Sequence, residues 1–201
     1  MDLALRYTAA AEAQGLRILA LKGVSIAEQL YGGFQNRPMA DVDLLVVDTR
    51  RFVDATDQAR SLGLIEVGAS DHALVFKEPS SGVILELHVS LTSCPGLFSV
   101  DHEALWENRV AVASTAMFRL GDADLLVHLA LHTAFQHALA ANAYHYQDFV
   151  RAFETLNPSL NPVLARAREW GALPALGLMV LASEKRAGDS SVLAGLKAKV
   201  G

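Results

Sequence analysis

Residues 39–47 read MADVDLLVV, and this stretch decides the fold that we expect for the chain. The apolar run from Val42 to Val47 is typical of a buried β-strand. Asp41 and Asp43 stand two residues apart, and alternate residues of a strand point to the same face of a sheet. The pattern therefore predicts a buried strand that carries two carboxylates on one face.

Two carboxylates held this close are unfavourable unless a cation sits between them. Oxygen ligands on a rigid strand suit Mg²⁺ and Mn²⁺, which then hold the phosphates of a substrate. Asp41 and Asp43 are accordingly candidate metal ligands. For an isolated D-x-D triplet the alternative is that Asp41 only begins the strand and Asp43 faces solvent.

A second strand is predicted over residues 83–89, VILELHV. Its alternation places Glu86 and His88 on one face and aliphatic side chains on the other. If this strand lies beside the first, Glu86 becomes a third carboxylate. Three carboxylates can bind two metal ions about 4 Å apart for in-line phosphoryl displacement, and one of them can deprotonate the attacking hydroxyl. The alternative is an edge strand with a solvated outer face.

A third candidate element is the segment LALKGVS, residues 19–25, in which a strand ends at a glycine and enters a helix. Gly23 lets backbone N–H groups approach a phosphate at the helix N-terminus. Lys22 and Ser25 add a charge and a hydroxyl, and Arg37 is a candidate triphosphate ligand. Simple chain reversal and a surface arginine are the alternatives.

Taken together, these motifs resemble the uncharacterised nucleotidyltransferase-like family of the polymerase-beta-type superfamily. The resemblance rests on the order and spacing of Leu21-Lys22-Gly23, Arg37, Asp41-Val42-Asp43 and Glu86-Leu87-His88. It covers residues 15–90 and continues more loosely at Leu131-His132 and Tyr146-Gln147-Asp148, which look like the family's helical histidine and later aspartate.

The resemblance implies an α/β (α+β) fold, with a small mixed sheet flanked by helices and a helical C-terminal region. It implies Mg²⁺-dependent transfer of a nucleoside monophosphate from an NTP to a hydroxyl or similar group, with release of pyrophosphate. By this match Asp41 and Asp43 are metal ligands, Glu86 is the third acid and Gly23 lies against the phosphates. Residues assigned to the side of the acceptor, a small molecule or a protein, are His88, His132 and Asp148.

The sequence departs from the wider superfamily pattern in three places. Val24 separates Gly23 from Ser25, the stretch from Gly23 to Asp41 is longer than usual, and the third acid is Glu rather than Asp. These departures, with a C-terminal part that is short for this family, support an alternative hypothesis. In that hypothesis the same fold serves as a non-catalytic binding or antitoxin-like regulatory module.

The chain changes character near residue 100. Short β-rich runs alternate with helical patterns over residues 1–100, whereas residues 101–201 are almost entirely helical in pattern. We therefore predict a nucleotidyltransferase-like α/β domain over 1–100 and a helical region over 101–201. In the second half the predicted helices cover residues 101–107, 122–140, 143–156, 161–170, 173–184 and 190–199.

The helical half contains His128, His132, His137 and His145. His128 and His132 stand four residues apart on one helix face, a spacing that can bind zinc. Leu129, however, follows the first histidine where metalloproteases have Glu. A zinc hydrolase is therefore the third and least favoured hypothesis, and polar packing between helices or contact with substrate is the alternative.

Composition limits the partners. The chain has 201 residues, of which 52% are hydrophobic and 19% charged, which excludes a disordered protein. Its net charge of −5 and its scattered basic residues argue against long nucleic acid. A lone cysteine, Cys94, and no secretory or membrane segment in the pattern predict a cytoplasmic protein without membrane association. The acceptor, the base of the NTP and the oligomeric state stay open at this stage.

Overall fold

The computed structural model describes residues 1–140, 142–187 and 191–200. The chain forms two compact units. The sheet unit comprises residues 1–91 and 101–121, and the helical unit comprises residues 92–100 and 122–201. Residues 101–121, which the sequence boundary at residue 100 grouped with the helical region, thus lie with the sheet.

A seven-stranded mixed sheet forms the centre of the sheet unit, in the order β3-β4-β5-β2-β1-β7-β6. Strands β2 and β5 are parallel, as are β1 and β7, and the other neighbouring pairs are antiparallel. The mixed sheet predicted from the sequence is thereby confirmed. The strands are β1 (Ile18–Ala20), β2 (Asp41–Val46), β3 (Ile65–Ala69), β4 (Ala73–Lys77), β5 (Ile84–His88), β6 (Val110–Ala111) and β7 (Phe118–Arg119).

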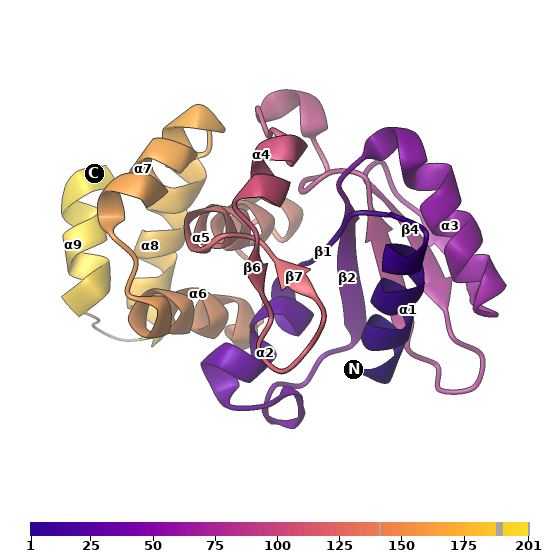
Figure 1. Ribbon diagram of the computed structural model, residues 1–201. Coiled ribbons are helices and arrows are strands. Elements are labelled where there is room, and N and C mark those ends of the chain that lie inside the picture. Colours follow the sequence, from indigo (N-terminus) through magenta and orange to yellow (C-terminus); the bar gives the residue numbers. More distant parts are fainter. Residues whose placement is uncertain (141, 188–190, 201) are drawn as a thin grey trace. The chain divides into compact units, whose positions relative to one another are not determined.

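One face of the sheet is apolar and is covered by helices α1 (Asp2–Ala13) and α3 (Phe52–Ser61), which lie side by side (Figure 1). Val42, Leu44 and Val46 of β2 belong to the same buried cluster as the apolar side chains of these helices. Tyr7 of α1 ties the two helices together, because its hydroxyl donates a 2.9 Å hydrogen bond to the carbonyl of Ala55. Since β2 alternates, its acidic side chains lie on the opposite face.

The last two strands of the sheet unit did not follow from the sequence pattern. The strands β6 and β7 have only two residues each, too few for alternation to be recognised. Strand β7 is recognised by its pairing with β1, which lies about a hundred residues earlier in the chain, and β6 pairs with β7. The unit also contains α2 (Lys22–Tyr31) and α4 (His102–Glu107).

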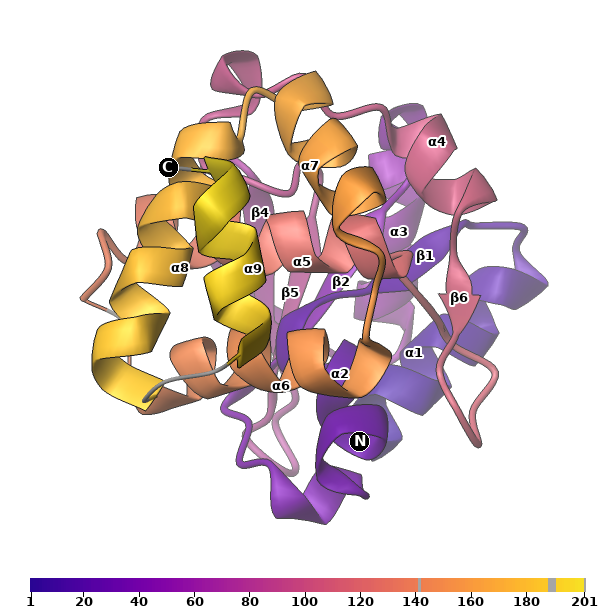
Figure 2. The same ribbon diagram turned by 90° about the vertical axis from the view of Figure 1, so that its left-hand side faces the viewer.

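The helical unit contains five α-helices within the described residues, and α7, α8 and α9 can be followed in Figure 2. Their bounds are α5 (Asp122–Leu131), α6 (Ala143–Leu156), α7 (Leu160–Glu169), α8 (Leu173–Ala187) and α9 (Ser191–Val200). In the part of the chain that the structure describes, no helix is long and apolar enough to cross a membrane.

The single helix predicted over 122–140 is wrong. Helix α5 ends at Leu131 and is followed by a π-helical turn, η4 (His132–Gln136). Ala138 and Leu139 then have φ angles of 45° and 59°, in the left-handed region that ends a right-handed helix. The alanine-rich sequence favours helix locally, but the hydroxyl of Tyr146 donates a hydrogen bond to the carbonyl of Leu139 and holds the chain in a turn.

Candidate active site

Two neighbouring parallel strands bring the acidic residues together. In the pairing of β2 with β5, Asp43 stands beside Glu86 and Leu45 stands beside His88. Side chains of paired residues share a face of a sheet, so Asp41, Asp43, Glu86 and His88 all project from one face. Ligand atoms of Asp43, Glu86 and His88 lie within 4.8 Å of one another.

Asp43 is the centre of this group and is 3% exposed, so it does not face solvent. Its Oδ1 accepts hydrogen bonds from Lys22 Nζ at 2.5 Å and from His88 Nε2 at 3.0 Å. Burial by itself would raise the pKa of Asp43, but the Lys22 charge and the His88 hydrogen bond outweigh it and hold that pKa below its usual range. Asp43 is therefore an anion at neutral pH.

Lys22 has an unusual backbone conformation. Its φ of 46° lies in the left-handed region, which costs a non-glycine residue about 1–3 kcal/mol. This conformation turns the chain from β1 into α2, and the backbone N–H of Leu21 donates a 2.9 Å hydrogen bond to the carbonyl of Asp43. The first turn of α2 is thus tied to the acidic strand through both backbone and side chain.

His88 contacts the acids directly. Its Nε2 is 3.0 Å from Asp43 Oδ1 and 3.5 Å from Glu86 Oε2. Burial alone would lower the pKa of His88, but its hydrogen bonds to Asp43 and Glu86 raise the pKa above the ordinary histidine value. Its Nδ1 is buried and has no hydrogen-bond partner within the described residues. The placement of His88 on the acceptor side remains a prediction.

Asp41 lies two residues before Asp43, at the first position of β2, and is half-buried. Burial and the neighbouring charge of Asp43 raise the pKa of Asp41, and Glu86 adds to this effect. Asp41 also lines a cavity of about 230 Å³ together with Arg37, Met39 and Val24. Of the acidic residues only Asp41 lines this cavity, which Asp43 and Glu86 do not reach.

The donor set fits a divalent cation. The pKa of Asp41 is raised first by burial and then by repulsion from the charges of Asp43 and Glu86. A cation among these oxygens would relieve that repulsion. Carboxylates are the ligands that Mg²⁺ and Mn²⁺ prefer, and an imidazole such as His88 is better tolerated by Mn²⁺.

Gly23 is buried at the second residue of α2, under the side chains of Arg37 and Met39. A Cβ at this position would lie 3.0 Å from both Arg37 Cζ and Met39 Cγ and closer still to an Arg37 nitrogen. The Ser25 hydroxyl donates a 2.7 Å hydrogen bond to the carbonyl of Lys22, which stabilises the same turn. The absence of a side chain at Gly23 therefore leaves room for the side chain of Arg37.

Gly23→Ala is expected to displace Arg37 while leaving the sheet unit folded. The clash involves the guanidinium group of Arg37 and the Cγ of Met39, both in flexible side chains, and Ala is favoured over Gly in a helix by about 1 kcal/mol. We expect thermal stability close to wild type and NTP affinity lowered by roughly tenfold, as for the loss of one charge-assisted contact. Titration with a fluorescent ATP analogue and Mg²⁺ measures the affinity.

Gly96→Ala is the matched control, because a Cβ at Gly96 meets nothing within 4 Å. Nucleotide affinity unchanged in both variants would contradict a role for the contact between Gly23 and Arg37. A large loss of stability in Gly23→Ala alone would show that Met39 and Arg37 cannot move aside.

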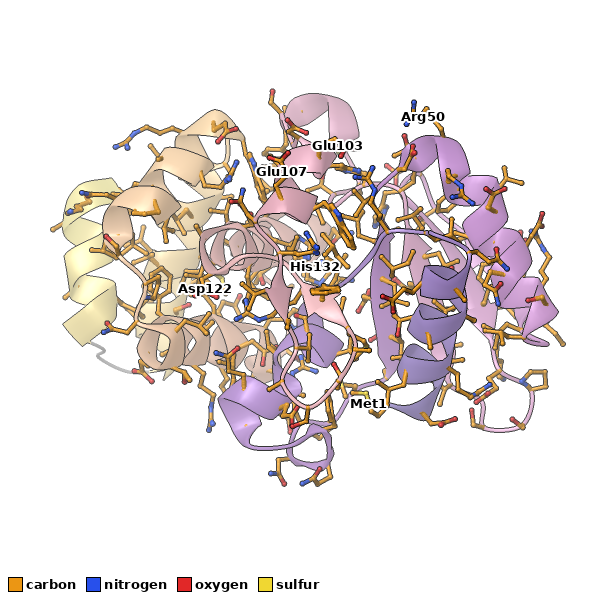
Figure 3. The ribbon with its side chains drawn as sticks, viewed as in Figure 1. Met1, Arg50, Glu103, Glu107, Asp122 and His132 are labelled. Carbon is orange, nitrogen blue, oxygen red and sulfur yellow. The ribbon has the colours of Figure 1, made fainter. Side chains whose placement is uncertain are left out.

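The remaining two predicted site residues lie in the helical unit. His132 is the first residue of η4 and is labelled in Figure 3, and Asp148 is a buried residue of α6. His132 is grouped there with His137 and His145, a set that the predicted straight helix over 122–140 could not bring together. The only sequence signal for this set was the number of histidines in the segment.

Comparison with solved structures identifies the fold. The crystal structure of ANT(2'')-Ia in complex with adenylyl-2''-tobramycin superposes with a TM-score of 0.61 at 14% identity, over 84% of this chain and 95% of that one. The crystal structure of an antigenic nucleotidyltransferase-like protein from Paracoccidioides brasiliensis gives 0.53 at 17% identity, over 94% and 89%. The chain therefore has a nucleotidyltransferase-like fold.

The family follows from the sequence. The model of a family described as uncharacterised nucleotidyltransferase matches residues 3–188. The chain belongs to this family, and the recognition made from its motifs is confirmed. A comparison with curated protein sequences gives no match.

Proposed function

We propose that this nucleotidyltransferase moves a nucleoside monophosphate from an NTP to a hydroxyl or similar group of an acceptor, with release of pyrophosphate, in a reaction that depends on Mg²⁺ or Mn²⁺. The observation that carries the proposal is the register of β2 and β5, which sets Asp43 beside Glu86 on the face that also bears Asp41. Carboxylates on rigid adjacent strands are suited to holding cations in a fixed geometry.

In this proposal Asp41, Asp43 and Glu86 hold the cation, which when bound stabilises charge on the α-phosphate and on the leaving pyrophosphate. Lys22 keeps Asp43 ionised and in place through its 2.5 Å contact. The backbone N–H groups at the start of α2, next to Gly23, face the triphosphate, and Arg37 adds a positive charge beside them.

Glu86 is the proposed base. Its side chain is 28% exposed, compared with 4% for Asp43, so it is accessible to an acceptor. Glu86 takes the proton of the acceptor hydroxyl while that oxygen bonds to the α-phosphorus. The bond from the α-phosphorus to the bridging oxygen breaks, and its electron pair leaves with pyrophosphate.

The acceptor class is proposed from a structural neighbour. The crystal structure of ANT(2'')-Ia is a complex with adenylyl-2''-tobramycin, a nucleotide joined to a small polyhydroxylated amine. The net charge of −5 on this chain suits a cationic acceptor of that kind better than a nucleic acid. We therefore place a small polar molecule ahead of a protein as the acceptor.

The test is pyrophosphate release from each of the four NTPs with Mg²⁺ or Mn²⁺, against a panel of aminoglycosides, sugars and unmodified proteins. We expect turnover that requires the cation and an acceptor and that produces a mass increase of one NMP on the acceptor. Mass spectrometry of the acceptor checks the product. NTP binding without turnover on any acceptor would instead favour the non-catalytic module.

A further inference from the structure

Three histidines of the helical unit converge on one point, and we propose that they bind a divalent transition-metal ion, for which Zn²⁺ is the expected occupant. The residues are His132 of η4, His137 in the turn that follows and His145 of α6. One nitrogen from each lies within 4.8 Å of the others. All three residues belong to the helical unit, whereas the carboxylates belong to the sheet unit, and the proposal does not rest on the proposed function.

The ring geometry is close to that of a three-histidine centre. The Nε2 atoms of His132 and His137 are 3.0 Å apart, and two nitrogens on a tetrahedral zinc ion are about 3.3 Å apart. The ring centroids of His137 and His145 are separated by 4.5 Å, and those of His132 and His145 by 5.5 Å. Movements of an ångström or so would bring the three nitrogens to one ion.

The second nitrogen of two of the rings is held by an amide oxygen. His132 Nδ1 donates to Gln136 Oε1, and His145 Nδ1 donates to Asn142 Oδ1 at 3.0 Å. Asn142 Oδ1 also accepts from the backbone N–H of Tyr144, which identifies it as the oxygen. With Nδ1 protonated, each ring presents the Nε2 lone pair, which is the arrangement by which metal-binding histidines are oriented in proteins.

The backbone around these residues is irregular in the way that is common at binding sites. A π-helical turn presents His132, and the left-handed residues Ala138 and Leu139 follow His137 directly. Left-handed non-glycine residues each cost about 1–3 kcal/mol and persist where the surrounding structure holds them. The backbone N–H of Leu139 donates to the carbonyl of Thr133, which closes the turn and fixes His137 near His132.

The chemistry of the site selects the metal. Three neutral imidazoles suit Zn²⁺, Co²⁺, Ni²⁺ and Cu²⁺ and bind Mg²⁺ poorly. Three protein ligands leave the fourth tetrahedral position for water or an anionic ligand. His128, whose ring centroid is 6.1 Å from that of His132, is not part of the set, so the ligands are not those of the H-x-x-x-H spacing.

The experiment is a titration of untagged, full-length protein with Co²⁺ and then Zn²⁺, in excess Mg²⁺ so that the carboxylates of the sheet unit are occupied. We expect one equivalent of Co²⁺ to give the intense visible bands of tetrahedral coordination, which Zn²⁺ then abolishes. His137→Ala and His145→Ala, both at half-buried positions, should each lose these bands and weaken Zn²⁺ binding at least ~100-fold. Gln136→Ala, which removes a supporting oxygen, should weaken it by roughly tenfold.

Glu86→Gln is the matched control. It alters the cluster of Asp43, Glu86 and His88 in the sheet unit, and it should leave the Co²⁺ bands unchanged. Circular dichroism checks that each variant is folded. Bands that survive in both histidine variants, or that disappear in Glu86→Gln alone, would overturn the proposal. So would the absence of any tetrahedral Co²⁺ signal in the wild-type protein.

Discussion

Asp43→Asn is expected to abolish cation-dependent nucleotidyl transfer, with turnover at least ~100-fold below wild type. Mutation of residues that only support the ligands of a metal site typically lowers metal affinity or activity by about 10–100-fold. Because Asp43 is proposed as a direct ligand, its loss should cost at least as much. Asparagine keeps the size of the side chain and removes the charge that pairs with Lys22 and His88. Pyrophosphate release under saturating NTP and Mg²⁺ is the measurement.

The same substitution also affects stability, and a double variant separates the two effects. Lys22, which is 15% exposed, would keep its charge and lose its closest counter-ion, and breaking a buried pair costs about 3 kcal/mol. Lys22→Met combined with Asp43→Asn removes both charges and should recover most of that stability in urea denaturation. Transfer should remain lost in the double variant.

Asp57→Asn is the control, because Asp57 is an exposed acid of α3 whose ion pair with Arg60 lies on the surface. It should change neither transfer nor stability by a measurable amount. Transfer that persists in folded Asp43→Asn would remove the carboxylate site as the basis of the proposed function.

The acidic face of the sheet could be anticipated because its signals are local. A strand alternates, so Asp41 with Asp43, and Glu86 with His88, were bound to share a face within each segment. That the two segments lie side by side was an assumption in the sequence analysis. The structure shows that they do, because β2 pairs with β5. Buried apolar runs such as β2 predict strands well, since burial and β-propensity act in the same direction.

The interactions of Lys22 and His88 could not be anticipated from local patterns. Lys22 contacts Asp43 from a left-handed backbone conformation, which sequence propensity disfavours for lysine. His88 contacts Asp43 because β5 is neighbour to β2 with this particular offset. Both depend on tertiary structure that overrides the preference of a single residue.

The histidines of the helical unit illustrate the same limit. Residues 132–140 contain strong helix formers, so the pattern predicted one uninterrupted helix. The bond from Tyr146 to the carbonyl of Leu139 joins α6 to the turn and stabilises the interruption. In an ideal helix the five residues from His132 to His137 correspond to about 500° of rotation, which would direct the two side chains to different faces of the helix. The π-helical turn is what lets their Nε2 atoms approach to 3.0 Å.

Arg166→Leu is expected to destabilise the helical unit by about 3 kcal/mol at pH 7 to 8 and by much less at pH 5. Arg166 Nε lies 2.6 Å from Asp124 Oδ1, and Asp124 is 2% exposed. Removing the arginine leaves a buried carboxylate without its cation, a change that typically costs about 3–5 kcal/mol. Urea denaturation followed by circular dichroism between pH 4 and pH 8 measures the loss.

The pH dependence follows from the protonation of Asp124. Burial raises the pKa of Asp124 to about 6 even though Arg166 lowers it, so the neutral form is favoured in the folded state. The pKa of Asp124 is higher in the folded state, at about 6, than in the unfolded state, at 3.8. Protonation of Asp124 therefore favours folding. This contribution is fully present below pH 3.8 and is lost as the pH rises through about 6. The rise in the pKa of Asp124 from 3.8 to about 6 corresponds to a pH-dependent change of roughly 3 kcal/mol in the free energy of unfolding of the wild-type protein.

Loss of Arg166 should raise the pKa of Asp124 further, so the difference between variant and wild type grows as the pH increases. Asp124→Asn in the Arg166→Leu background removes the titrating group and should restore stability and flatten the profile. Arg168→Leu, at an exposed position of the same helix, should stay within about 0.5 kcal/mol of wild type at every pH. An equal loss at pH 5 and pH 8 in Arg166→Leu would instead assign the effect to packing, because the stacking of Arg166 near Trp170 does not titrate in this range.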